Sequence, residues 1–214
     1  MLTIHAADAV LGAPDGADAV AVDGGVVVAV GPYDEIAAAF PAARPRRWSG
    51  LLTRGLVNPA AVRLLEEAYH PDPREADELG TRPLTGEALA ALAPDEARWG
   101  ASARRGLQRM LRHGTTAVAG TFTRPSVRTA VLRSGLRVLP PAAYTAGPPF
   151  SLDPLEAAGR EPGAVPARTG GPPAAGEAAD LAVFGVRDVA ELAARGAGSC
   201  VATVLGGRLL FRAR

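Results

Sequence analysis

The hydrophobic and polar positions follow two different periods along the chain. In residues 1–53, short apolar runs alternate with glycine-containing turns, as in LTIHAADAVLG and ADAVAVDGGVVVAVG. Residues 19–22 and 26–30 flank Asp23-Gly24-Gly25, which predicts a β-hairpin because glycine supplies the positive φ of a tight turn. The following PYDEIAAAFP predicts one short helix. We therefore expect residues 1–53 to be mostly β.

A helical period replaces this alternation in the middle of the chain. Within residues 84–113, Trp99, Ala103, Leu107 and Met110 recur at helical spacing, and Gly114 follows where a C-terminal cap is expected. The apolar residues 115–121 predict a strand, residues 126–133 a second amphipathic helix, and residues 136–139 another strand. This alternation of strands and helices is typical of parallel βα units.

Residues 146–176 differ in composition from both neighbours. They are rich in Pro, Gly and Ala and poor in large apolar side chains, so little buried surface is available to offset their ordering entropy. We expect a mobile linker there. The chain then returns to β structure, with strands expected at 180–185, 200–205 and 208–211 and a short helix at 189–194.

Composition and charge narrow the classes of function. With 48% apolar and 21% charged residues in 214, the chain is globular, and a formal charge of +1 does not favour nucleic acid or an anionic membrane as partner. All 23 basic residues are Arg, which excludes chemistry that requires lysine. Cys200 is the single cysteine, and neither a signal sequence nor an apolar run near 20 residues is present. A cytoplasmic protein without an internal disulfide is expected.

The order of several motifs carries a family resemblance. A Gly-Gly hairpin is followed by GLVN, a helix ending in RHGTT, a helix ending in SGLR, and finally ADLAVFG with VATVLGGRLL. This order resembles the amidohydrolase superfamily, and within it the imidazolonepropionase and aminodeoxyfutalosine deaminase type. The resemblance implies that the two chain ends join in one small β domain, with a metal-bearing (β/α)₈ barrel between them.

The expected fold class is accordingly α/β, with a shortened barrel. A complete barrel needs ~250 residues, and the space between the two β segments suffices for about three βα units. We expect a composite β-sandwich-like domain from residues 1–53 and 177–214. A barrel remnant should span residues 54–145, with the linker at 146–176.

The resemblance also shows what this chain lacks. In the family, the first barrel strand ends in a His-x-His pair that binds a metal ion. The matching positions hold Ala60 and Val62, which cannot ligate. The family's later ligands come from strands that should follow the third unit, where this chain has its expected linker. The sequence therefore predicts no metal and no other cofactor.

No catalytic residue is assigned, and three residues remain as weak candidates for substrate binding. His70 follows Glu66 and Glu67 beyond the first barrel strand, although a solvated helix face is the favoured interpretation. Thr121 and Tyr144 would line the pocket side of the second and third strands, where hydroxyls are common. His5, His113 and Cys200 are interpreted as structural, the cysteine as a packed thiol.

Two functions from different classes follow. The first is a non-catalytic protein that binds a partner or a small molecule. The alternative is a hydrolase of non-peptide C–N bonds in a cyclic amide, amidine or nucleoside-like substrate, as in histidine breakdown or futalosine-route menaquinone synthesis, with ligands completed by another subunit. A degenerate chain under little functional constraint is a third possibility.

Assembly follows from the missing barrel walls. Three parallel strands would leave the lumen face, formed by Ala60, Val62 and Val118, open to solvent. Because the linker offers few apolar anchors beyond Phe150, Leu152 and Leu155, we expect a homodimer to cover this face, with a heteromeric protein partner as the alternative.

Overall fold

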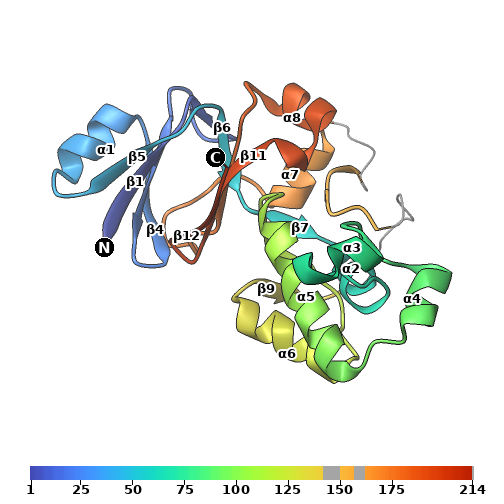
Figure 1. Cartoon of the computed structure of the whole chain (residues 1–214). Helices are drawn as coiled ribbons and strands as arrows, with labels where there is room; N and C mark the ends of the chain where they lie inside the picture. The colour runs from blue at the N-terminus through green and yellow to red at the C-terminus, as the bar shows by residue number, and fades with distance from the viewer. Residues whose placement is uncertain (142–149, 157–161, 214) are drawn as a thin grey trace.

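The computed structural model describes residues 1–141, 150–156 and 162–213. It is a mixed α/β structure with a β half and a mainly helical half, connected near β6 and β7 (Figure 1). The described residues form three separate sheets and no closed barrel. In this part of the chain, every helix is too short or too polar to span a lipid bilayer.

The first sheet is built from the N-terminal residues alone, in the order β4-β3-β1-β5. The predicted hairpin is confirmed, with Gly24 at φ 58° in the turn between β3 and β4. The short helix α1 covers one face, where its Ile36 packs with Ile4 and Ala21. The elements are β1 (Leu2–Ala6), β3 (Ala19–Asp23), β4 (Val26–Gly31), α1 (Tyr33–Ala39) and β5 (Arg44–Arg47).

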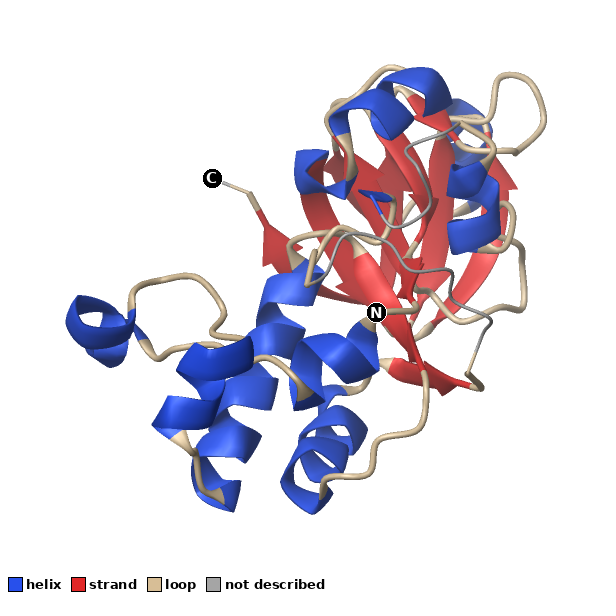
Figure 2. Ribbon diagram, turned by 90° about the vertical axis from the view of Figure 1, so that its right-hand side faces the viewer, coloured by secondary structure: helices blue, strands red, loops and turns tan. Residues whose placement is uncertain are grey.

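The second sheet unites the two ends of the chain. Its order is β12-β11-β10-β6-β2, and β10 pairs antiparallel with β6 so that Ala182 lies opposite Thr53. Apolar residues of both sheets, among them Val20 and Leu181, form one core cluster, and the strands of this half lie together in Figure 2. The elements are β2 (Ala9–Val10), β6 (Leu51–Arg54), β10 (Leu181–Phe184), α8 (Val189–Arg195), β11 (Cys200–Leu205) and β12 (Arg208–Arg212), with a 3-10 turn at Ala197–Ser199.

The third sheet consists of three parallel strands in the order β7-β8-β9, as the alternating pattern predicted. Helices α5 and α6 pack against each other beside it (Figure 1). The elements are β7 (Leu56–Asn58), α2 (Ala61–Glu66), a 3-10 turn (Pro73–Glu75), α3 (Ala76–Leu79), α4 (Gly86–Leu92), α5 (Glu96–Leu111), β8 (Thr115–Ala119), α6 (Pro125–Ser134) and β9 (Arg137–Leu139).

The helical period over residues 84–113 is interrupted once. Ala93 adopts a left-handed conformation at φ 42° and ends α4, directly before Pro94. Asp95 then begins α5, because its carboxylate accepts a hydrogen bond from the backbone N–H of Arg98 at 2.8 Å. Proline disfavours helical geometry in the residue before it, so the break follows from local sequence.

The segment expected to be a linker packs against the rest of the chain in its described parts, and part of it packs against the β half. Helix α7 (Ala164–Thr169) places Val165 in a fully buried position, and Leu155 is also fully buried. Both belong to the cluster that contains Phe184 and Leu192. The segment has few large apolar residues, but these two are anchored, which differs from the expectation of an unanchored linker.

The lumen face is covered by the chain itself, contrary to the expectation. Val118 is fully buried and Ala60 is 8% exposed. Phe150 and Leu152 pack against the cluster that contains both, and the guanidinium of Arg63 lies 5.1 Å from the centre of the Phe150 ring. In the described residues, the open apolar face on which the homodimer expectation rested is therefore absent.

Candidate functional site

The carboxyl edge of the three-stranded sheet is where the family places its metal. Here β7 ends at Asn58 and α2 begins at Ala61, so Ala60 and Val62 lie at the start of a helix and not on a strand. The side chain of the buried Asn58 is used locally. Its Oδ1 accepts from the N–H of Ala60 at 2.9 Å, and its Nδ2 donates to the carbonyl of Leu152 at 3.4 Å.

These residues do not fit a divalent metal. Neither apolar side chain carries a donor atom, and the only oxygen that Asn58 offers is engaged by the backbone. Within residues 1–141, 150–156 and 162–213, no three His, Cys, Asp or Glu side chains come together as a metal site requires.

Glu66 holds the next loop of this edge. Its carboxylate accepts hydrogen bonds from the N–H of Thr123 at 2.8 Å, the hydroxyl of Thr123 at 2.9 Å and the N–H of Arg124 at 2.7 Å. It thereby binds donors of the two residues before α6, whereas the first N–H within the helix, that of Ser126, donates to Glu96 at 3.3 Å. Thr121 is exposed in the same loop.

His70 is fully buried, so its interpretation as part of a solvated helix face is wrong. Its Nε2 lies 2.8 Å from the carbonyl oxygen of Leu64, and its Nδ1 lies 3.3 Å from a guanidinium nitrogen of Arg109. A carbonyl only accepts and a guanidinium only donates, so Nε2 carries the proton and Nδ1 accepts. Burial, the largest cause, and the nearby Arg109 and Arg105 lower the His70 pKa to about 4.

The backbone of His70 is engaged as well. Its N–H donates to the hydroxyl of Ser102 at 2.8 Å, and its carbonyl accepts from Nε of Arg105 at 2.8 Å. His70 therefore connects α5 with the segment that follows α2. It offers no free ring nitrogen to a substrate. The third candidate, Tyr144, lies outside the described residues.

The other titratable candidates have structural surroundings. Burial raises the pKa of the Cys200 thiol to about 11, which disfavours the nucleophilic thiolate. Nδ1 of His113 lies 3.1 Å from the carbonyl of Arg109 near the end of α5. His5 is buried and accepts a hydrogen bond at Nδ1 from the indole N–H of Trp48 at 3.3 Å.

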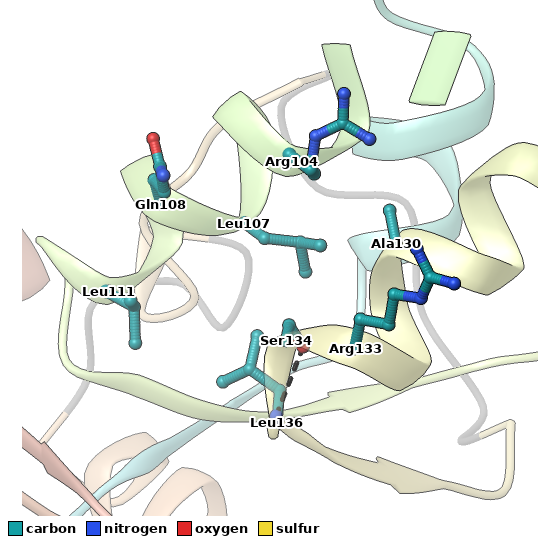
Figure 3. A pocket seen from close by; sticks show the side chains of 8 residues that line it. All are labelled: Arg104, Leu107, Gln108, Leu111, Ala130, Arg133, Ser134 and Leu136. Carbon is teal, nitrogen blue, oxygen red and sulfur yellow. Dashed lines mark hydrogen bonds between the residues drawn. The ribbon is translucent and has the colours of Figure 1, made fainter. Parts of the chain in front are cut away.

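A groove between α5 and α6 offers a different kind of site, with a volume of about 230 Å³. Figure 3 shows Leu107 between the two helices, with Arg104 on α5 and Arg133 on α6. Leu107 and Leu136 are buried in its apolar floor, whereas both arginines are exposed. Neither arginine forms an ion pair with a described residue. The lining residues are Arg104, Leu107, Gln108, Leu111, Ala130, Arg133, Ser134 and Leu136.

Sequence reasoning missed this groove because its residues come from two separate helices. Each helix has an arginine beside its apolar stripe, which was the available signal. The pattern of one helix alone does not show that the two stripes form a pocket.

Several solved structures resemble part of this chain. Ochratoxinase from A. niger has 18% sequence identity, a TM-score of 0.44, and coverage of 65% of this chain and 31% of its own. Guanine deaminase from E. coli has 15% identity, a TM-score of 0.43, and coverage of 65% and 36%. An adenosine deaminase from Xanthomonas campestris, solved with bound zinc, has 23% identity, a TM-score of 0.40, and coverage of 64% and 33%. The chain thus spans about a third of the length of these proteins.

Sequence comparison identifies one segment. Among curated protein sequences, no relative matches the chain. Residues 19–43, which hold the β3–β4 hairpin and α1, match the family described as "Imidazolonepropionase-like composite domain, bacteria". This match lies in the β half that unites the chain ends, and it confirms the resemblance to the imidazolonepropionase type of the amidohydrolase superfamily.

Proposed function

We propose that this chain is a non-catalytic, amidohydrolase-like protein that binds a small amphipathic carboxylate in the groove between α5 and α6. The single observation that carries the proposal is the pairing of an apolar floor with two unpaired arginines, Arg104 and Arg133. The expected ligand has a short hydrocarbon part and one carboxylate.

The hydrocarbon part of the ligand is expected to lie on the apolar floor of the groove. Leu107 is 3% exposed and Leu136 is 5% exposed, so both are held in place by the surrounding core. A hydrocarbon chain placed over them would remove its own apolar surface from water, at roughly 25 cal/mol per Å². The groove volume of about 230 Å³ suits a ligand of modest size.

The carboxylate of the ligand is expected to bind the two arginines at the rim of the groove. A guanidinium matches a carboxylate with two parallel N–H donors, and two unpaired guanidinium groups leave that capacity unused. The hydroxyl of Ser134 is already hydrogen-bonded within the chain. Its hydroxyl donates to the carbonyl of Val131 at 2.6 Å and accepts from the N–H of Leu136 at 3.1 Å.

The non-catalytic part rests on the carboxyl edge of the sheet. The positions that hold the family's first two metal ligands carry Ala60 and Val62, and Asn58 and Glu66 are occupied with backbone groups. The alternative, a C–N hydrolase completed by another subunit, would need that subunit to supply a complete set of ligands. No described residue of this chain favours it.

Titration calorimetry with octanoate and with octylammonium tests the binding site, because the two probes share a tail and differ in charge. Octanoate should bind, and Arg104→Gln with Arg133→Gln should weaken it by about tenfold, which corresponds to roughly 1.4 kcal/mol. Arg128→Gln, an exposed position on α6, is the matched control. Equal binding of octylammonium, or unchanged octanoate binding by the double variant, would exclude the proposed site.

A further inference from the structure

A second hollow lies in the β half, far from the groove in sequence. It has a volume of about 240 Å³ and is lined by residues of β5, by Trp48 and by the end of β12. We call it the arginine hollow, and its lining residues are Arg44, Pro45, Arg46, Arg47, Trp48 and Arg212.

The two strands that form it are the edges of different sheets. β5 ends the first sheet and β12 ends the second. Trp48 joins them, because it directly follows β5 and its ring lies 5.6 Å from the guanidinium carbon of Arg212. The hollow is thus formed where the exposed edges of the two packed sheets approach each other.

The charge of this hollow is unbalanced. Four of its six lining residues are arginines and none is acidic. Among the described residues, none of the four forms an ion pair, although Arg47 lies 4.2 Å from the centre of the Tyr33 ring. A protein with a net charge of +1 has acidic side chains available for pairing, so this concentration of positive charge is a local property.

A neighbouring hollow continues the positive surface. It has a volume of about 410 Å³, shares Arg46 with the arginine hollow, and includes Arg208 and His5 among its lining residues. Burial and the charge of Arg46 lower the pKa of His5 to about 4, so this imidazole is neutral at pH 7.

We propose that the arginine hollow binds the phosphate groups of a small, multiply charged phosphorylated molecule. Arginine matches phosphate oxygens with its fork of N–H donors, and four unpaired guanidinium groups suit an anion with more than one charge, such as a pyrophosphate. The neighbouring hollow has room for the remainder of such a molecule.

An extended nucleic acid fits this surface less well. Proteins that bind single strands stack the bases on free aromatic rings. The ring of Trp48 is engaged, since its indole N–H donates to Nδ1 of His5 at 3.3 Å and the guanidinium carbon of Arg212 lies 5.6 Å from the ring centre. The structural alternative is that arginines on edge strands only prevent sheets of neighbouring molecules from pairing.

Isothermal titration of the full chain with inorganic pyrophosphate tests the proposal. The ionic strength should be held at roughly 0.1 M, where charges farther apart than ~10 Å are screened. Arg46→Gln with Arg212→Gln should weaken binding and raise the dissociation constant at least tenfold. Arg46→Lys with Arg212→Lys retains the charge but loses the fork, so it should weaken binding by a smaller factor.

The matched control is Arg74→Gln with Arg128→Gln, which removes the same charge from two exposed sites in the helical half. It should change the dissociation constant by less than about twofold, since no phosphate contact is lost. Circular dichroism and size exclusion would establish that all variants remain folded and keep the association state of the unaltered chain.

Three outcomes would overturn the proposal. They are no pyrophosphate binding, an equal loss in the control, and tighter binding of oligodeoxythymidine with increasing length. Association of the glutamine variants without a loss of binding would favour edge protection.

Discussion

The Nε2 atom of His70 lies 2.8 Å from the carbonyl oxygen of Leu64, which joins the segment after α2 to the last turn of that helix. The same ring nitrogen lies near α5, where Gly106 provides space for it. A Cβ at Gly106 would stand 2.8 Å from Nε2 of His70 and 2.6 Å from Cδ2 of Leu65. The position of His70 therefore depends on the absence of a side chain on the neighbouring helix.

Replacing Gly106 tests that dependence. Alanine favours helix over glycine by about 1 kcal/mol, but at Gly106 the two close contacts should outweigh this gain and lower the free energy of unfolding by roughly 1–3 kcal/mol. Gly100→Ala on the same helix is the control, because its nearest contact is 3.4 Å, to Cβ of Ser126. It should be neutral or stabilising in urea unfolding. Equal effects of both substitutions would contradict the packing described for His70.

Two buried histidines predict a loss of stability in mild acid. The pKa values of His5 and His70 are lowered from 6.5 to about 4 in the folded chain. Above pH 6.5 both are neutral whether folded or unfolded, and their contribution is complete. As the pH falls from 6.5 towards 4, the unfolded chain binds protons first, so each histidine lowers the free energy of unfolding by up to about 1.4 kcal/mol per pH unit.

Urea unfolding at several pH values, followed by circular dichroism, would measure this slope. His70→Gln keeps a donor for the Leu64 carbonyl but cannot titrate, so the slope between pH 6 and about 4.5 should fall by up to about 1.4 kcal/mol per pH unit. An unchanged slope would show that His70 is not the titrating group.

Metal content is predicted from the carboxyl edge of the sheet. Purified protein should contain less than about 0.1 equivalent of zinc or iron, because Ala60 and Val62 supply no ligand atoms. Ala60→His with Val62→His should not restore a site, since the first position precedes α2 and the second lies within it. Elemental analysis measures both, and about one chelator-resistant ion per chain would contradict the non-catalytic proposal.

Leu155 should protect α7 from proteolysis, because both belong to the same core cluster. Leu155→Ala should cost about 2–4 kcal/mol through the lost burial and the remaining cavity. It should also speed tryptic cleavage at Arg168 in α7. Leu132→Ala, at a side chain that is 70% exposed, is the control. Rapid cleavage of the unaltered chain at Arg168 would support the original linker interpretation instead.

Assembly remains a proposal and needs its own measurement. Val118 is fully buried, so Val118→Arg should unfold the helical half whether or not the chain dimerises. A homodimer would have to use exposed apolar side chains, of which Leu132 is 70% and Val138 is 45% exposed. We propose the β9 edge as its interface. Light scattering after size exclusion should give a dimer that Val138→Arg weakens, whereas a stable monomer would exclude it.

Local signals accounted for much of the fold. The hairpin at Gly24 and the end of α6 at Gly135 followed from glycines at φ 58° and φ 79°. The end of α4 at Ala93 is predictable from Pro94, because proline disfavours helical geometry in the residue before it. The burial of His70 could not be predicted, because it depends on Ser102, Gly106 and Arg109 of a separate helix. Similarly, composition indicated that residues 146–176 contain few apolar side chains, but it could not show that Leu155 and Val165 reach the core.

The pairing of β6 with β10 places a constraint on the order in which the molecule can form during synthesis. Leu52 lies opposite Val183, so the second sheet needs strands from both ends of the chain. While the ribosome is still producing the middle, β6 has no neighbour on the side that β10 will occupy, and its backbone donors and acceptors stay unpaired. Closing so long a loop slows folding. The growing chain is therefore exposed to aggregation until its last strands emerge, and a C-terminal truncation would extend that exposure indefinitely.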